Sequence, residues 1–301
     1  MMEQNRARYA VGVDVGGSHS CAAVIDLLSG NTVGSPCISP LDSKAGAGEI
    51  VSSLTGNIAA AIESSGVDSV EGAGLAFPGP FDYVHGISTV QGVGKYDRIY
   101  GLDVASCLFS TLYDHGVRDF RFVNDASAFA LGEFAAGAAK GAGRAVALTL
   151  GTGVGSGFVA EGKLVEGGDE VPAYGWVYHL PFEGGIVDEA FSTRWICGRY
   201  AELTGTEVSG AKDVADRCAC GDDKALTLFR EYGERLASFA APVLMRFKAD
   251  VLVLGGNISR AYGYFGPELE KGLSESGCST DVRTSVLLDK AALYGAASLL
   301  V

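Results

Sequence analysis

The sequence predicts an α/β protein of two domains, and two similar segments carry this prediction. In residues 9–26 a β-branched apolar run is interrupted by Gly16-Gly17-Ser18 and then resumes, which is the pattern of two strands joined by a tight turn. Residues 145–160 repeat the plan around a turn at 151–157 with glycine at every other position. With 301 residues, the chain is long enough to bury two cores.

The other elements follow from the spacing of apolar residues. Residues 49–64 carry them at helical intervals, and residues 74–77 indicate a strand that ends in the rigid turn Pro78-Gly79-Pro80. The next stretch predicts a helix at 104–113, a strand at 120–123 and an amphipathic helix at 126–139. The remainder predicts helices at 188–203, 211–217, 224–248 and 289–300, and a strand at 249–254.

Glycine turns that follow apolar strands suit phosphate binding, because backbone amides can approach the anion closely. Asp14 ends the first strand and could hold Mg²⁺ directly or through water, while Thr152 and Ser156 add hydroxyl donors in the second turn. The first turn is neither a P-loop nor a Rossmann fingerprint, since in both of those the glycine turn leads into a helix. A third strand, at residues 249–254, ends in Gly255 and Gly256. Three turns of this kind in one chain indicate that a nucleotide is bound from several sides. The predicted nucleotide-binding residues are Asp14, Gly16, Gly17, Ser18, Gly151, Thr152, Gly153, Gly255 and Gly256.

Several motifs occur in the order and spacing of a known family. They are Asp14-Val-Gly-Gly-Ser18, Ala76-Phe-Pro-Gly-Pro-Phe-Asp82, Val123-Asn-Asp-Ala-Ser-Ala128, Leu148-Thr-Leu-Gly-Thr-Gly-Val-Gly-Ser-Gly157, Leu254-Gly-Gly-Asn257 and Ala291-Ala-Leu-Tyr-Gly-Ala-Ala297. Through them nearly the whole chain resembles the ROK family of sugar kinases and related repressors. The resemblance implies an α/β, two-domain actin-like ATPase (ribonuclease H-like) fold with an interdomain cleft, and ATP and Mg²⁺ as cofactors. We expect residues 1–118 with 289–301 to form one domain and 119–288 the other.

Asp125 is the predicted catalytic base. Phosphoryl transfer to a sugar hydroxyl needs a carboxylate that orients the hydroxyl and accepts its proton. Asp125 follows the strand at 120–123, and α/β folds place ligands at such strand ends. By resemblance, Asp125 matches the catalytic base of the family and Asn124 its sugar-binding neighbour. The alternative is that one of the two only caps the following helix, although both roles can hold at once.

The residues expected to bind the sugar, which accepts the phosphoryl group, depart from the family pattern. Family kinases usually have Gly-Glu-x-Gly-His after the second turn, whereas this chain has Gly175-Trp-Val-Tyr-His179, so Trp176 replaces a sugar-binding Glu. Asp188 stands where the family has a further sugar-binding Glu. A lost hydrogen bond costs about 1–3 kcal/mol, whereas indole offers a flat face for a sugar ring or an N-acetyl methyl. We expect Trp176, His179 and Asp188 to bind the sugar, although His179 could equally be a core residue.

Charge and apolar content limit the partners. The net charge of −13 disfavours nucleic acid, and no stretch approaches the ~18 apolar residues of a membrane span. Residues 1–8 are polar and lack a signal-peptide core. Only thirteen residues precede Asp14, too few for the helix-turn-helix of the family's repressors. We therefore expect a cytoplasmic enzyme with a small-molecule sugar substrate and no nucleic-acid or membrane partner. Dimers are common in the family, so the resemblance also suggests a homodimer.

The seven cysteines, an odd number, indicate reduced intracellular thiols. Many family members bind zinc through a Cys-x-Cys-Gly-x-x-Gly-Cys run soon after the His of the acceptor motif. In this chain Cys218-Ala-Cys220 lies far beyond His179 and has no third cysteine nearby. Two cysteines cannot close a tetrahedral site alone, so we expect no zinc and instead burial as small apolar side chains.

The leading hypothesis is ATP-dependent phosphorylation of a hydroxyl of a hexose or hexose derivative, with Asp125 as general base. One alternative is a nucleotide- or sugar-binding sensor that has lost catalysis, which Trp176 and the missing zinc run favour. Another is an actin-like phosphotransferase with a non-hexose acceptor. At the first turn, an ordinary hairpin in which Asp14 makes only turn hydrogen bonds also stays open.

Overall fold

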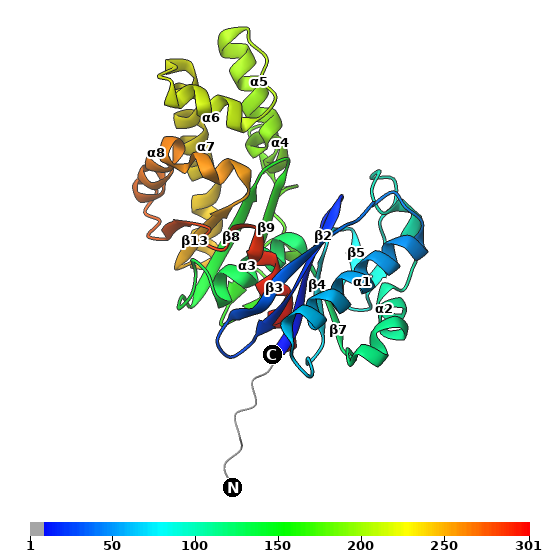
Figure 1. Ribbon diagram of the computed structural model, residues 1–301. Coiled ribbons are helices and arrows are strands. Elements are labelled where there is room, and N and C mark those ends of the chain that lie inside the picture. Colours follow the sequence, from blue (N-terminus) through cyan, green and yellow to red (C-terminus); the bar gives the residue numbers. More distant parts are fainter. Residues whose placement is uncertain (1–8) are drawn as a thin grey trace. The chain divides into compact units, whose positions relative to one another are not determined.

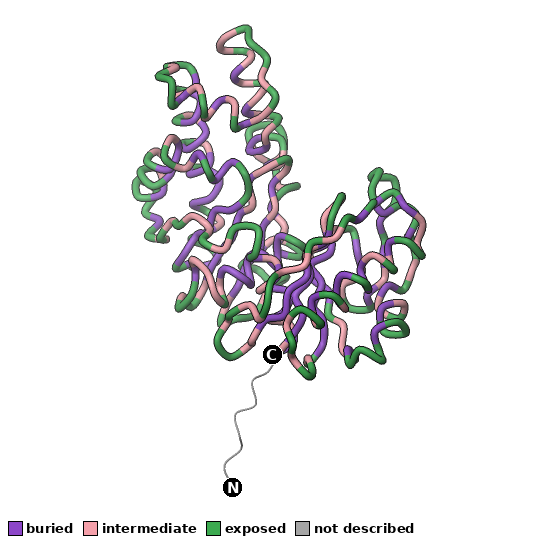
Figure 2. The backbone as a smooth tube through the Cα atoms, in the orientation of Figure 1, coloured by how far each residue is buried: buried purple, intermediate pink, exposed green. Residues whose placement is uncertain are grey.

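The computed structural model describes residues 9–301 (Figure 1), so the expectation for the polar segment 1–8 lies outside the described residues. The described chain forms two compact units. The first contains residues 9–136 and Asp289–Val301, and the second contains Gly137–Leu288. Strands that are buried along most of their length run through the centre of each unit (Figure 2). Within residues 9–301, no helix is long and apolar enough to cross a membrane.

The first unit is built on a five-stranded sheet of order β3-β2-β1-β4-β7. Its strands are β1 (Tyr9–Val15), β2 (His19–Asp26), β3 (Asn31–Pro40), β4 (Ala73–Phe77) and β7 (Phe120–Asn124). The predicted hairpin is confirmed, because β1 pairs antiparallel with β2 across the glycine turn. Strands β1, β4 and β7 run parallel, so their carboxyl ends lie at one edge. The sequence analysis missed β3, whose prolines are tolerated because it is an edge strand.

Helices cover both faces of this sheet because its strands alternate their side chains. Val11, Val13 and Val15 of β1 point to the face covered by α1 (Ala47–Ser65), which contributes Ile50, Leu54 and Ile58 to the same core. On the opposite face, Gly12 lets α9 (Ala291–Ala297) approach so closely that a Cβ on Gly12 would lie 2.0 Å from the Leu293 carbonyl oxygen. The C-terminal helix is therefore part of the first unit.

Helix α3 (Asp125–Ala135) packs against α9 through glycines on both helices. A Cβ on Gly132 would lie 1.9 Å from the Ala291 oxygen, and one on Gly295 would lie 1.8 Å from the Ala128 oxygen. This packing and the pairing of β7 with β4 place β7 and α3 in the first unit. That unit thus continues past the expected boundary at residue 118 to Ala136. The expected cleft between the domains stays a prediction.

The second unit repeats the sheet plan, with the order β10-β9-β8-β13-β14. Strand β8 (Arg144–Leu150) pairs antiparallel with β9 (Val154–Ala160) and parallel with β13 (Val251–Gly255). The short β10 (Lys163–Leu164) and the parallel β14 (Asp281–Thr284) complete the edges. The predicted similarity of the two halves is confirmed at the level of strand order.

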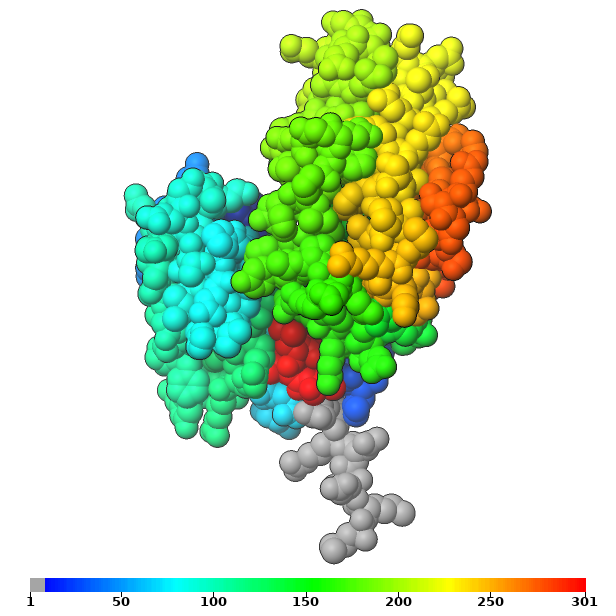
Figure 3. Space-filling model, turned by 180° about the vertical axis from the view of Figure 1, so that it is seen from behind, coloured from blue at the N-terminus to red at the C-terminus, as the bar shows by residue number. Residues whose placement is uncertain are grey.

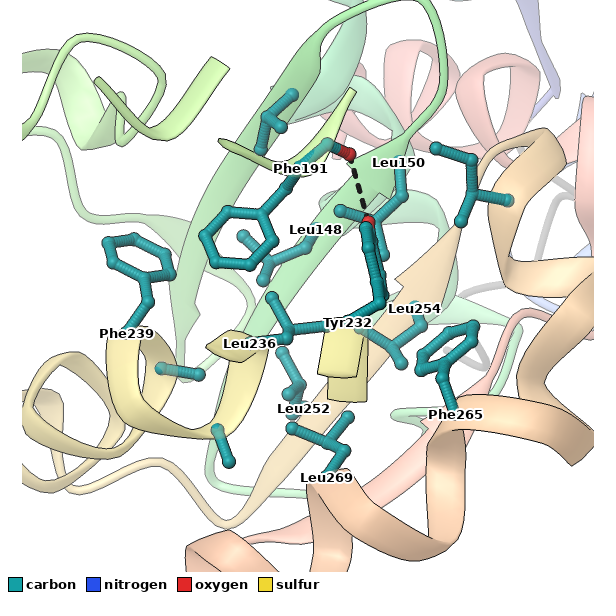
Figure 4. Close-up of a cluster of buried hydrophobic side chains, with 14 of the residues drawn as sticks. Leu148, Leu150, Phe191, Tyr232, Leu236, Phe239, Leu252, Leu254, Phe265 and Leu269 are labelled. Carbon is teal, nitrogen blue, oxygen red and sulfur yellow. Dashed lines mark hydrogen bonds between the residues drawn. The ribbon is translucent and has the colours of Figure 1, made fainter. Parts of the chain in front are cut away.

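The core of the second unit lies between its sheet and two long helices, α7 (Asp223–Phe247) and α8 (Tyr262–Glu275). These helices pack side by side, and both reach the surface in Figure 3. Leucines of β8 and β13 meet aromatic side chains in this core (Figure 4). The fully buried Tyr232 hydroxyl donates a hydrogen bond to the Phe191 carbonyl oxygen, 2.9 Å away.

The remaining elements mostly match the predicted ranges. The helix predicted at 188–203 is broken at Ser192 into α4 (Val187–Phe191) and α5 (Thr193–Thr204). Helix α8 and strand β14 were not predicted, since glycines and Pro267 interrupt the apolar pattern of α8. The other elements are α2 (Val104–Leu112), α6 (Ala211–Ala219) and two small hairpins, β5 (Phe81–Asp82) with β6 (Ile87–Ser88) and β11 (Pro181–Phe182) with β12 (Gly185–Ile186).

Candidate active site

Asp14 and Asp125 lie at the same edge of the first sheet. Asp14 is the sixth residue of β1, and Asp125 directly follows β7. Strand β4 lies between these two strands and runs parallel to both, so the carboxyl ends of all three meet at one edge. The two carboxylates are close enough that the charge of Asp125 raises the pKa of Asp14. The structure therefore brings the predicted metal-binding and catalytic acids together within one unit.

Asn124 takes the capping role at the start of α3. Its side-chain oxygen accepts hydrogen bonds from the Ala126 and Ser127 amides, at 3.0 and 3.4 Å. Its amide nitrogen donates to the Tyr83 hydroxyl at 3.3 Å. The Asp125 side chain accepts a hydrogen bond from the Ala126 amide at 2.9 Å, and the residue is exposed to solvent. The carboxylate of Asp125 is thus accessible to a ligand.

Both carboxyl groups hold their protons more tightly than ordinary aspartates. Partial desolvation, with the charges of Asp125 and Asp289, raises the pKa of Asp14 to about 6, against a lowering contribution from His19. Surrounding protein atoms also raise the pKa of Asp125, while hydrogen bonds and the positive charge of Lys95 act in the opposite direction. Two neighbouring acids with raised pKa values are typical of a functional site.

The first glycine turn is fixed by a hydrogen bond of its own and by contacts from the loop at residues 41–43. The Gly16 amide donates to the His19 carbonyl at 3.0 Å, closing the turn. The Leu41 and Ser43 amides donate to the carbonyls of Ser18 and Gly17, at 3.0 and 3.3 Å. The Ser18 hydroxyl lies 3.2 Å from Nδ1 of His19. These bonds engage the Gly16 amide and the carbonyl groups of Gly17 and Ser18.

A loop that the sequence analysis did not single out also reaches this turn. Buried Tyr96 donates a hydrogen bond from its hydroxyl to the Gly16 carbonyl. Beside it, Lys95 lies so close that a Cβ on Gly17 would be 3.3 Å from its Nζ atom. In the sequence, Lys95 simply stands between Gly94 and Tyr96. This local pattern does not indicate that the loop contacts the first glycine turn.

In the second unit, the turn after β8 is open at its first two residues, Gly151 and Thr152. A Cβ on Gly151 would meet nothing within 4 Å, and Thr152 is exposed. The Thr193 amide and hydroxyl both donate to the Gly151 carbonyl, at 2.8 and 2.9 Å, which ties the start of α5 to the turn. The hydroxyl of Ser156 is not available as a ligand donor, because it is buried and bonds the Gly175 carbonyl and the Val177 amide.

Asp188 contacts the same turn. Its Oδ1 atom accepts a hydrogen bond from the Val154 amide at 2.8 Å, and its Oδ2 atom forms an ion pair with Arg194 at 2.8 Å. A Cβ on Gly153 would lie 2.5 Å from Oδ1, so only glycine fits there without a shift. The carboxylate expected to bind sugar therefore already supports the second glycine turn.

The third turn lies beside the second, because β13 runs parallel to β8 and Gly255 pairs with Thr149. Gly256 has φ +77°, and a Cβ there would lie 2.3 Å from the Leu150 carbonyl oxygen. The Ser259 hydroxyl donates to the Gly256 carbonyl at 2.8 Å. The second unit thus presents two of the predicted glycine turns at one edge of its sheet.

Trp176 belongs to a short aromatic segment. Its ring centroid lies 5.0 Å from that of Tyr174 and 6.2 Å from that of Tyr178, and the Tyr178 ring lies edge-on to His179. His179 is exposed, so its interpretation as a core residue is wrong. Trp176 is partly exposed. Both side chains are accessible to a ligand.

The cysteine pair divides into one buried and one exposed thiol. Cys218 packs in the core of the second unit as expected, and burial raises the pKa of its thiol to about 11. Cys220 is exposed instead of buried. In the part of the chain that the structure describes, no three His, Cys, Asp or Glu side chains are arranged to hold a metal ion. A Mg²⁺ ion bound mainly through nucleotide phosphates needs only one or two carboxylates.

Comparison with known proteins places the two sheets in the actin-like ATPase class. A ROK hexokinase from Thermus thermophilus superimposes with a TM-score of 0.82 at 25% identity, covering 96% of this chain and 97% of the other. The sequence model of the ROK family matches residues 10–301. The chain belongs to the ROK family.

Two curated relatives are similar over part of the chain. A glucokinase from Thermotoga maritima is 34% identical over 203 residues, which are 59% of this chain and 64% of the relative. The N-acetylgalactosamine kinase AgaK from Shewanella sp. is 29% identical over 153 residues, 45% of this chain and 49% of the relative. The chain thus spans less than two thirds of the length of these relatives.

Proposed function

We propose that this protein transfers the γ-phosphoryl group of ATP to a hydroxyl of a hexose or hexose derivative. The observation that carries the proposal is the pair Asp14 and Asp125, two carboxylates with raised pKa values at one sheet edge beside a glycine turn. Family membership and the activities named for the relatives support it.

The residues fit a magnesium nucleotide. Asp14 offers a carboxylate oxygen, the ligand type that Mg²⁺ prefers, and the turn at Gly16 and Gly17 has no side chains to exclude a phosphate. When bound, Mg²⁺ would neutralise charge on the phosphate oxygens. In the second unit the open backbone at Gly151 and the exposed Thr152 would bind phosphates in the same way, together with Gly153. Gly255 and Gly256 would lie against the nucleotide.

In the proposed reaction, the sugar hydroxyl oxygen bonds to the γ-phosphorus while the bond from that phosphorus to the β,γ-bridging oxygen breaks. The hydroxyl proton passes to the Asp125 carboxylate, and ADP leaves with the electron pair of the broken bond. A raised pKa favours this role, because a carboxylate that binds its proton more tightly is a stronger base. Asn124 lies one residue before Asp125 and would bind a neighbouring sugar hydroxyl.

On the acceptor side, we propose that Trp176 and His179 bind the sugar. Trp176 offers an aromatic face and His179 an exposed imidazole. An indole face stacks on the apolar side of a sugar ring or on an N-acetyl methyl, so the preferred acceptor would have such a face. Asp188 would act on the sugar only indirectly, since its oxygens already bond the Val154 amide and Arg194.

The test is ADP release from ATP–Mg²⁺ with a panel of hexoses, amino sugars, N-acetylated sugars and polyols. We expect release that depends on one class of sugar and that falls by about 10²–10⁴-fold in Asp125→Asn. The matched control is Asp119→Asn, which makes the same change at the other end of β7, where Asp119 pairs with Arg121.

Two outcomes would contradict the proposal. Bound ATP with no release on any sugar would favour a sensor that has lost catalysis, or an acceptor outside the sugars. Sugar-dependent release that survives Asp125→Asn would keep the kinase but remove Asp125 as its base.

A further inference from the structure

Lys95 is a cation positioned beside the first glycine turn. Its Nζ and Cε atoms would lie 3.3 and 3.4 Å from a Cβ on Gly17, so the stem of the side chain passes directly over the turn. The side chain is exposed, and its ammonium forms no ion pair among the residues that the structure describes. It is also close enough to Asp125 to interact with that carboxylate electrostatically.

The loop that bears Lys95 is held against the turn by its neighbour. The Tyr96 amide donates to the Ser43 carbonyl at 2.6 Å, and its hydroxyl donates to the Gly16 carbonyl. The Tyr96 ring packs 5.2 Å from the Phe77 ring at the end of β4. Tyr96 adopts φ +59°, a backbone conformation that is costly for a bulky residue and is held by these contacts.

The charges on this edge make the position of a lysine significant. Asp14 and Asp125 are both acids, and a transferred phosphoryl group would add negative charge beside them. The nearby positive charge of Lys95 reduces this repulsion. Lysine binds phosphate as a compact point charge with three donors, which suits a group that changes position during transfer.

We propose that Lys95 binds the phosphoryl group that is transferred, and that it stabilises this group as the group moves from ATP to the acceptor hydroxyl. This inference rests on the proposed kinase function and adds a residue to its machinery. The Lys95 ammonium offsets charge on the non-bridging oxygens while the bond to the bridging oxygen breaks and the bond to the acceptor forms.

The test compares Lys95→Met and Lys95→Gln with Lys95→Arg. The matched control is Lys212→Met, at an exposed residue of α6 that pairs with Asp216. Steady-state phosphorylation gives kcat and KM, and calorimetry gives the affinities for ATP–Mg²⁺ and ADP–Mg²⁺. We expect kcat to fall about 10²-fold or more in the neutral variants. Lys95→Arg should recover most of this loss, and ADP affinity should stay within about twofold of wild type because ADP lacks the transferred group.

A kcat within about threefold of wild type in both neutral variants would overturn the inference. An equal loss of ATP and ADP affinity would also overturn it, because that pattern means that Lys95 only shapes the turn. If wild-type protein transfers no phosphate, the proposed function fails. The binding measurements then still decide the role of Lys95, since weaker ATP binding with unchanged ADP binding supports it and unchanged binding of both contradicts it.

Discussion

The hydroxyl of Tyr96 donates a hydrogen bond to the carbonyl of Gly16, a residue 80 positions earlier in the chain. This bond joins the loop that carries Lys95 to the first glycine turn. The turn already receives hydrogen bonds at Gly17 and Ser18 from the loop at residues 41–43. Its shape is therefore determined by two loops that are remote in sequence.

Replacing Tyr96 by Phe should destabilise the first glycine turn without creating a cavity in the core. The change keeps the buried ring but leaves the Gly16 carbonyl without this donor, so we expect a loss of about 1–2 kcal/mol in the free energy of unfolding. We also expect weaker binding of ATP–Mg²⁺ by calorimetry. Tyr100→Phe is the control, because Tyr100 is 58% exposed. Equal stability of the two variants would show that the Tyr96 hydroxyl does not hold the turn.

Asp14→Asn should stabilise the protein at neutral pH while removing magnesium-dependent nucleotide binding. The pKa of Asp14 rises from 3.8 to about 6 on folding, so the folded protein binds more protons than the unfolded chain between these values. The stability of the wild type therefore falls as pH rises from about 4 to 6, and the asparagine avoids this loss. We expect the free energy of unfolding of Asp14→Asn to exceed that of the wild type by an amount on the order of 1–3 kcal/mol at pH 7.5, and this difference should disappear near pH 3.5.

Urea unfolding of both proteins across this pH range measures the effect. The same change at Asp26, a partly exposed acid whose pKa is lowered by hydrogen bonds from Ser29 and Leu28, provides a control with the opposite sign. Asp26→Asn should destabilise the protein at neutral pH. A pH-independent difference between Asp14→Asn and the wild type would mean that the ionisation of Asp14 is not the cause.

Gly132→Ala should disrupt the packing that positions Asp125. The new methyl group would lie 1.9 Å from the Ala291 carbonyl oxygen, so α3 and α9 must move apart, at a cost of about 2–3 kcal/mol. Because Asp125 is the first residue of α3, we also expect lower activity. Gly56→Ala is the matched control, because Gly56 lies on the exposed side of α1 and a Cβ there meets nothing within 4 Å. This change should raise the free energy of unfolding by about 0.5–1 kcal/mol, since alanine favours a helix more than glycine does. Thermal unfolding of both variants compares the two effects.

Asp188→Ala distinguishes a role in the second glycine turn from a role in sugar binding. The change removes the acceptor of the Val154 amide and the partner of Arg194, so we expect ATP affinity to fall about 10–100-fold. Sugar affinity, measured separately by calorimetry, should change much less. The control is Asp213→Asn, a change at a partly exposed acid that accepts a hydrogen bond from the Ser209 hydroxyl. A loss confined to sugar affinity would instead assign Asp188 to the acceptor.

Local patterns in the sequence determined the two strand–turn–strand segments and the positions of Asp14 and Asp125 at strand ends. These features could be predicted because apolar alternation, glycine turns and helix starts depend on residues that are close in the chain. The same reasoning predicted most helices, including α7 and the return of the C-terminal helix to the first unit.

Only the tertiary structure decided which side chains support the turns. The placement of Lys95 over Gly17, the bond from Tyr96 to Gly16 and the contact of Asp188 with Val154 join residues far apart in the chain. The tertiary structure also placed β7 and α3 in the first unit, through pairing with β4 and packing on α9. Such contacts depend on how separate elements pack, and packing is a property of the folded chain that no local spacing encodes.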